Sequence, residues 1–313
     1  MTANKGRRGA KYIWNDVRKN KWLYIFLLPG ITFLFIFKYL PIFFNIIAFQ
    51  DYNIASGIKG LFASRWVGLE NFKYIFLESG DFWKVFRNTF VLSIYRLAWG
   101  FPAPIILALL LNEVKRIRFK KITQTIVYLP YFISWVVIAG MVQLLLAGDG
   151  AVNEILKALG MEPIKFMISN NWFRTIVVAS TIYKEIGYAS IIFMAALSGI
   201  NEELYEAAGI DGAGRWKKIL YITIPQLTPT IIVVFILQVG NVIKGGVDQV
   251  LLLYNPMVYD VGDIIGTYVY RTGIREGRFS YSTAIGLFES VIAITLMIIT
   301  NKLAKKYSEG GIM

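Results

Sequence analysis

Six long apolar segments, separated by shorter polar and charged ones, dominate the pattern of the chain. They cover residues 22–49, 85–111, 122–147, 173–200, 227–253 and 283–303. Each contains the roughly 20 mostly apolar residues that a helix needs to cross the hydrocarbon core of a bilayer. Lys38 and Pro41 interrupt the first segment, so we expect that helix to kink or to end early. The pattern therefore predicts an all-α integral membrane protein with six transmembrane helices.

Composition supports a membrane protein and argues against catalysis. Of the 313 residues, 56% are hydrophobic and 17% are charged, which is too few polar residues for a soluble domain. The sequence has no cysteine and no histidine, so the usual thiolate and imidazole ligands and bases are missing. An intramembrane enzyme would need clustered carboxylates or a Ser–Lys pair, and no span carries paired acids at helical spacing. The net charge of +13 is concentrated beside apolar segments, which disfavours nucleic-acid binding.

The distribution of Lys and Arg predicts the orientation. Eighteen of these residues lie in the N-terminal tail, the loop 112–121, the loop 204–225 and the C-terminal tail, against eleven in the alternate loops. Because basic residues favour the cytoplasmic side, both termini are expected there. The basic start of the chain resembles a signal peptide, but no cleavage site with small residues follows, so we expect a retained anchor. We divide the chain into a basic tail (1–21), a transmembrane domain (22–303) with a cytoplasmic loop (201–225), and a short tail (304–313).

The outer loops are expected to carry structure of their own. Residues 50–84 mix aromatic and charged residues, which is typical of short interfacial helices. Residues 151–169 place apolar residues at helical spacing, which predicts an amphipathic surface helix. Packing against neighbouring helices and docking of a partner are equally good explanations for that helix.

The stretch 201–225 is polar and rich in small residues, although two apolar spans flank it. Asn201 is a suitable cap for a helix beginning at Glu202, which should weaken at Gly209 and turn near Asp211–Gly212. A second helix is expected from about Ala213 to Pro225. The small residues would let the backbone of another protein approach closely. An ordinary amphipathic loop returning to the membrane is the alternative on these grounds.

The sequence "EAAGIDGAGRWKKILYITIP" resembles the EAA loop of ATP-binding-cassette importer permeases. Glu206, Ala207, Ala208 and Gly212 match its first part, and Ile222 and Pro225 follow at its spacing, with Ile224 where leucine is usual. The resemblance implies that the helix after Asn201 docks in a cleft of a cytoplasmic ATPase. The residues it assigns to ATPase coupling are Glu206, Ala207, Ala208, Gly209, Asp211, Gly212, Ala213, Ile222 and Pro225. The chain lacks a phosphate-binding loop of its own, so ATP and Mg²⁺ would be bound and used by the partner ATPase.

Further stretches, among them "WVGLENF", "QTIVYLPYFISWVV" and "YSTAIGLFES", resemble one branch of the carbohydrate-uptake permeases. That branch is related to the lipoprotein-linked and uronic-acid oligosaccharide importers of Gram-positive bacteria. The resemblance implies a multi-pass protein of the cell membrane that translocates an oligosaccharide. Its expected partners are a second, different permease subunit, two ATPase subunits and an extracellular solute-binding lipoprotein, with no nucleic acid.

Charged and polar residues inside the spans are candidates for the substrate pathway, because a charge at the bilayer centre costs about 2.5–3.5 kcal/mol and usually faces a cavity or partner. Lys244 and Asp248 have the spacing of an ion pair, which would be a structural bridge or a substrate contact. Lys184 and Lys244 would suit an acidic cargo, whereas Lys38 and Arg96 are expected to reach a membrane edge. The pathway candidates are Tyr183, Lys184, Glu185, Gln238, Asn241, Lys244 and Asp248.

Two other functions fit the spans. A permease for another small polar solute, such as glycerol phosphate or an osmolyte, would have the same architecture. A channel or membrane scaffold would also have these spans, but it would leave the EAA-like loop unexplained.

Overall fold

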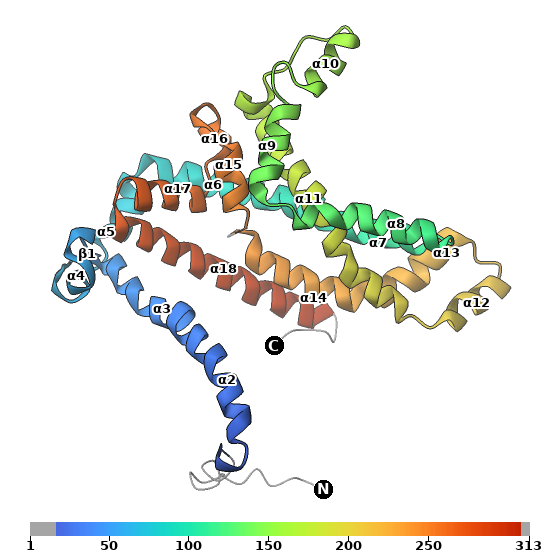
Figure 1. The fold of residues 1–313 in the computed structure, drawn as a ribbon, viewed down its shortest axis with the longest axis horizontal. Coiled ribbons are helices and arrows are strands. Elements are labelled where there is room, and N and C mark those ends of the chain that lie inside the picture. The colour runs from blue at the N-terminus through green and yellow to red at the C-terminus, as the bar shows by residue number, and fades with distance from the viewer. Residues whose placement is uncertain (1–16, 244, 308–313) are drawn as a thin grey trace.

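A computed structural model of the chain describes residues 17–243 and 245–307 (Figure 1). Within these ranges, five helical segments are long and apolar enough to cross a membrane, and a bent pair of helices is a sixth if it forms one span. Counting the bent pair as one span gives the six expected. The five are Lys21–Phe49, Gly80–Asn112, Asn170–Ser198, Arg215–Asn241 and Phe279–Leu303, and the bent pair joins Ile117–Phe132 to Trp135–Leu145.

The first span is distorted where the sequence predicts it. Helix α2 (Lys21–Leu34) continues through a π-helical turn, η1 (Phe35–Tyr39), into α3 (Leu40–Phe44) and the 3-10 turn η2 (Asn45–Phe49). Lys38 lies in the π turn, and Pro41 follows it at the start of α3, so the bulge accommodates the helix position that lacks an N–H. The helix therefore bulges but does not end. It extends away from the other spans, and α2 and α3 bury no residue (Figure 1).

Short elements follow the first span, as expected for residues 50–84. Strands β1 (Gln50–Asp51) and β2 (Arg65–Trp66) pair antiparallel and are a small departure from an all-helical fold. The helical pieces around them are η3 (Ile54–Ser56), α4 (Gly57–Ala63), α5 (Glu70–Lys73) and η4 (Tyr74–Glu78).

The second span begins one turn earlier than expected and the third is broken. The second comprises α6 (Gly80–Tyr95), η5 (Arg96–Gly100) and α7 (Pro102–Asn112). In the third, α8 (Ile117–Tyr128) and η6 (Leu129–Phe132) are bent by 101° from α9 (Trp135–Leu145). A continuous span over 122–147 is therefore the wrong description. The amphipathic stretch after it forms α10 (Ala151–Ala158), followed by η7 (Phe166–Ile168).

The fourth and fifth spans enclose the EAA-like loop. Helix α11 (Asn170–Ser198) leads to α12 (Glu202–Ile210), and α13 (Arg215–Lys218) continues through η8 (Ile219–Thr223) into α14 (Ile224–Val242). The expected fifth span, 227–253, is wrong at both ends. The long helix begins at Arg215, and residues up to 253 belong to a separate helix, α15 (Val247–Leu253). Gly246 separates the two helices with φ +78°, a left-handed conformation suited to glycine.

The described residues after α15 form η9 (Pro256–Val258), α16 (Tyr259–Gly262), α17 (Ile265–Tyr270), η10 (Arg271–Arg275) and the long α18 (Phe279–Tyr307). Helix α18 packs against α14 and α17 and against η2 at the end of the first span. Buried apolar clusters join α6 to α17 and α18, α9 to α11 and α15, and α7 to α11 and α14.

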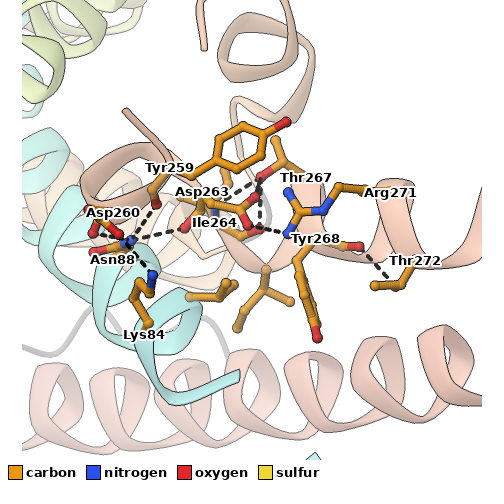
Figure 2. Close-up of polar contacts among 12 residues, drawn as sticks. Lys84, Asn88, Tyr259, Asp260, Asp263, Ile264, Thr267, Tyr268, Arg271 and Thr272 are labelled. Carbon is orange, nitrogen blue, oxygen red and sulfur yellow. Dashed lines mark hydrogen bonds and ion pairs between the residues drawn. The ribbon is translucent and has the colours of Figure 1, made fainter. Parts of the chain in front are cut away.

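A polar cluster fastens α16 and α17 to the second span (Figure 2). The side-chain amide of Asn88 donates to the carbonyl oxygens of Asp260, at 3.0 Å, and Asp263, at 3.3 Å. The Asp263 carboxylate accepts from Arg271 at 2.7 Å and from Thr267 at 2.8 Å. These bonds satisfy a buried carboxylate and fix the segment between the fifth and sixth spans.

Candidate coupling loop and transport pathway

The first helix of the EAA-like loop begins as the sequence predicts. The side chain of Asn201 accepts a hydrogen bond from the backbone N–H of Glu203 at 3.0 Å. Glu202 and Glu203 occupy the first turn, where negative charge is favourable next to the exposed N–H groups.

The end of α12 explains why glycine occupies position 212. The N–H of Ala213 donates to the carbonyl of Ala208 at 2.8 Å, and that of Gly212 to Gly209 at 3.1 Å. This pair of bonds is a Schellman motif, whose turn residue must be left-handed, and Gly212 has φ +76°. The turn at Asp211–Gly212 is confirmed, although the helix continues through Gly209 to Ile210.

The second helix differs from the expected one. It begins at Arg215 and does not end at Pro225. The π turn η8 lies directly before Pro225 and joins α13 to α14, so the helix continues past the position that lacks an N–H. The loop is thus joined directly to α14. Ile222 lies within η8.

Side-chain contacts hold the two loop helices together. The ammonium of Lys218 donates to the carbonyl oxygen of Tyr205 at 2.7 Å, and the Tyr205 hydroxyl lies 3.0 Å from that of Thr223. Arg215 forms an ion pair with Glu113 at 3.1 Å, so the loop after α7 lies at the same end of the molecule as the EAA-like loop. The two helices of the loop 201–225 are therefore held together as one unit, the braced loop.

The exposed surface of this unit includes two residues that the sequence pattern did not single out. Glu206 and Ala207 are exposed, as docking would require. Ile210 and Trp216 are also exposed, at 88% and 77%. Large apolar side chains with this exposure stand out in a loop that is otherwise polar. In the sequence, Ile210 and Trp216 could have been noticed as large apolar residues within an otherwise polar loop.

A cavity of about 220 Å³ lies among the second, third, fourth and fifth spans. Three pathway candidates, Glu185, Gln238 and Asn241, line it, and Trp135 of α9 contributes an aromatic wall. Amide, carboxylate and guanidinium groups beside an aromatic ring are suited to a hydroxylated solute. The polar lining residues are Arg96, Thr181, Glu185, Gln238, Asn241 and Gln249.

Arg96 was expected to reach a membrane edge, but it is buried inside the protein, with 8% of its surface exposed. Its guanidinium donates to the carbonyl of Gly245 and, at 2.9 Å, to the side-chain oxygen of Gln249. The Gln249 amide in turn donates to Ser180 at 2.7 Å and its oxygen accepts from Thr181 at 2.9 Å. The hydrogen bonds among Arg96, Gln249, Ser180 and Thr181 therefore link the second span, the fourth span and α15 beside the cavity.

The other pathway candidates lie elsewhere. Tyr183 lines a separate apolar cavity of about 450 Å³ among α9, α10 and α11. Lys184 is buried, with its ammonium against backbone carbonyls of the third span and not in the polar cavity. Asp248 is exposed in the first turn of α15. Lys244, and with it the expected pair with Asp248, lies outside the described residues.

Comparison with known proteins covers both the loop and the cavity. Residues 100–309 match the family described as binding-protein-dependent transport system inner membrane component. The chain is 43% identical to protein LplB of Bacillus subtilis over 100% of this chain and 96% of that one. It is 42% identical to the polygalacturonan/rhamnogalacturonan transport system permease protein YteP of the same organism, over 94% and 91%.

Solved structures give the same result. A chain of a bacterial ABC transporter involved in the import of the acidic polysaccharide alginate is 38% identical, with a TM-score of 0.87 over 94% of this chain and 98% of that one. A second structure, solved with an alginate pentasaccharide-bound periplasmic protein, gives 37% and 0.88, over 98% and 100%. The protein therefore belongs to the family of inner-membrane components of binding-protein-dependent transport systems.

Proposed function

We propose that the chain is a permease subunit of an ATP-driven importer and that its cargo is an oligosaccharide. One observation carries the proposal: the braced loop 201–225 lies between α11 and α14, the two helices that supply Glu185, Gln238 and Asn241 to the polar cavity. A displacement of the loop would therefore move two walls of that cavity. Rigid movements of helices about a fixed site are the usual basis of alternating access.

The driving partner would be a cytoplasmic ATPase pair. Glu206 and Ala207 present a carboxylate and a small surface, and Ile210 and Trp216 add apolar area. ATP and Mg²⁺ would be bound by the ATPases, and this chain would translocate without catalysing a reaction. The orientation with both termini and this loop in the cytoplasm remains part of the proposal and is supported by the basic clusters.

The cargo would be hydroxyl-rich and, by similarity to the relatives named for polygalacturonan and alginate, an acidic oligosaccharide. The cavity combines Arg96 with Glu185 and with amides that can both donate and accept hydrogen bonds. A small polar solute such as glycerol phosphate is the alternative. The remaining partners would be a second permease subunit and an extracellular solute-binding lipoprotein, in the cell membrane of a Gram-positive bacterium.

Reconstitution tests this proposal. The full chain would be purified with its co-expressed permease and ATPase partners, placed in proteoliposomes, and supplied with the cognate binding protein. Neutral oligosaccharides, uronic-acid oligosaccharides and glycerol phosphate would be offered in parallel. ATP-dependent uptake of an oligosaccharide is the expected result. If only glycerol phosphate were taken up, the proposed oligosaccharide cargo would be wrong. Recovery of the chain without an ATPase would overturn the proposed role.

A further inference from the structure

The break in the third span interrupts the helical hydrogen bonding at the end of η6, where the N–H of Ile133 still donates to the carbonyl of Pro130 at 3.2 Å. The last turn of η6 ends at Ile133, which is extended at φ −79° and ψ 138°, and α9 starts after Ser134. The last carbonyls of a helix find no N–H donor within that helix. In a membrane, each such group costs several kcal/mol unless another group satisfies it.

Lys184 of α11 satisfies these carbonyls. Its ammonium donates to the carbonyl oxygens of Tyr131, at 2.7 Å, Pro130, at 3.4 Å, and Ile133. A lysine ammonium has three N–H donors, so three carbonyls account for all of them. The positive charge also lies at the negative end of the η6 helix, where it is favourable.

Aromatic rings complete the environment of this ammonium. It lies 5.6 Å from the ring centroid of Tyr131 and 5.5 Å from that of Trp135, one residue on each side of the break. Cation–π attraction at these distances strengthens when the cation is removed from water, and Lys184 is 8% exposed.

The surface of α11 is shaped to receive the broken helix. A Cβ at Gly187 would lie 1.9 Å from the carbonyl oxygen of Val127, so only glycine allows this approach. One residue further, the ring of Tyr188 stacks on that of Tyr131 with centroids 3.9 Å apart. The contact made by Lys184 is therefore one part of a fitted joint between α8, η6 and α11.

We propose that Lys184 is a positioning residue that holds the third span in its bent form, so that Trp135 forms a wall of the polar cavity. The neighbouring Glu185 points into that cavity from the same helix. Lys184 thus acts on the pathway through α9 and not by contact with the cargo. Its effect on transport rests on the proposed function, whereas its effect on the bend does not.

The bend can be measured with spin labels, because the sequence has no cysteine of its own. Cysteines would replace Phe119 on α8 and Leu144 on α9, both exposed at 59% and 75%. With a rise of 1.5 Å per residue and a bend of 101°, the two backbone positions are about 24 Å apart across the bent joint and about 38 Å apart in a straight helix. Double electron–electron resonance on the complex in nanodiscs distinguishes these lengths.

The parent chain should give the short distance. Lys184→Met should shift the distribution to longer values or broaden it, and Lys184→Arg, which keeps the cation, should restore most of the short distance. Lys38→Met removes an exposed lysine of the first span and should leave the distance unchanged. A long distance in the parent, or identical distributions for the Met and parent chains, would refute the positioning role.

Uptake in the same variants separates the two proposals. If Lys184→Met lengthens the distance and lowers uptake while Lys184→Arg recovers both, the positioning role extends to transport. If the distance responds but the parent complex transports no oligosaccharide, the proposed function fails and the role in the bend stands. Unchanged uptake in a Met variant that has lost the bend would overturn the role in transport.

Discussion

Arg96 lies directly against Gly246: a Cβ at position 246 would be 2.1 Å from a guanidinium nitrogen of Arg96. The break between α14 and α15 is therefore shaped by a side chain from the second span. Glycine is required at this position for two reasons, its left-handed φ of +78° and the absence of space for any side chain.

Gly246→Ala should lower the stability of the protein, because the left-handed conformation costs about 1–2 kcal/mol in a residue with a Cβ and Arg96 must also move. Gly240→Ala is the matched control, since a Cβ there would lie 3.4 Å from the sulfur of Met297 and would meet only ordinary contact. The midpoint of thermal unfolding in detergent measures both. Equal midpoints would show that neither the left-handed φ nor Arg96 constrains position 246.

Arg96→Met and Gln249→Leu should each destabilise the protein by about 1.5–3 kcal/mol, because each leaves hydrogen-bonding groups unpaired away from water. The double variant should cost less than the sum, with a coupling of about 0.5–3 kcal/mol. Urea or thermal unfolding of the parent, the two single variants and the double variant gives this double-mutant cycle. Strict additivity would contradict the direct contact between these side chains.

Glu206→Lys or Ala207→Trp should abolish or strongly weaken association with the ATPase without removing the chain from the membrane. The first reverses the exposed charge and the second fills the space that a close approach needs. Co-purification with the ATPase measures this directly. Glu154→Lys reverses a charge on α10, remote from the loop, and should leave co-purification intact. Full association and transport in both loop variants would exclude the proposed docking surface.

Gly212→Ala should weaken ATPase association by about fivefold, because holding alanine in the left-handed turn costs about 1 kcal/mol or more. Gly214→Ala is its control: Gly214 has φ −71° and open space where a Cβ would be placed. Titration of the ATPase against each variant in nanodiscs gives the two affinities. If both alanines behave alike, the shape of the turn does not matter for docking.

Gln238→Leu should reduce uptake while leaving ATPase association unchanged, because it removes donor and acceptor groups from the polar cavity but is remote from the loop. The loss should appear in initial uptake rates in proteoliposomes. Thr228→Val lies on the same helix outside the cavity and should retain uptake. Normal uptake by the leucine variant would place the pathway elsewhere.

Local patterns predicted much of this architecture, because each span and each loop helix depends on nearby residues. The cap at Asn201 and the turn at Gly212 are of this kind. Pro130 and Ser134 were a local signal for the break at Ile133, and two consecutive glycines were one for the break at Gly246. Both breaks were missed because the long apolar segments around them favoured continuous spans. The partners of Lys184 and Arg96 could not be predicted, because they lie 54 and 149 residues away in the sequence and depend on how the spans pack.

The direct connection of the braced loop to α11 and α14 has a mechanical consequence. Glu185 lies about 20 Å from the loop end of α11 at Ser198, and Gln238 lies about 20 Å from the end of the loop at Pro225, at 1.5 Å per residue. The two helices thus extend from one rigid loop by similar lengths. A single tilt of that loop would displace Glu185 and Gln238 by similar amounts, so the two sides of the cavity would move together.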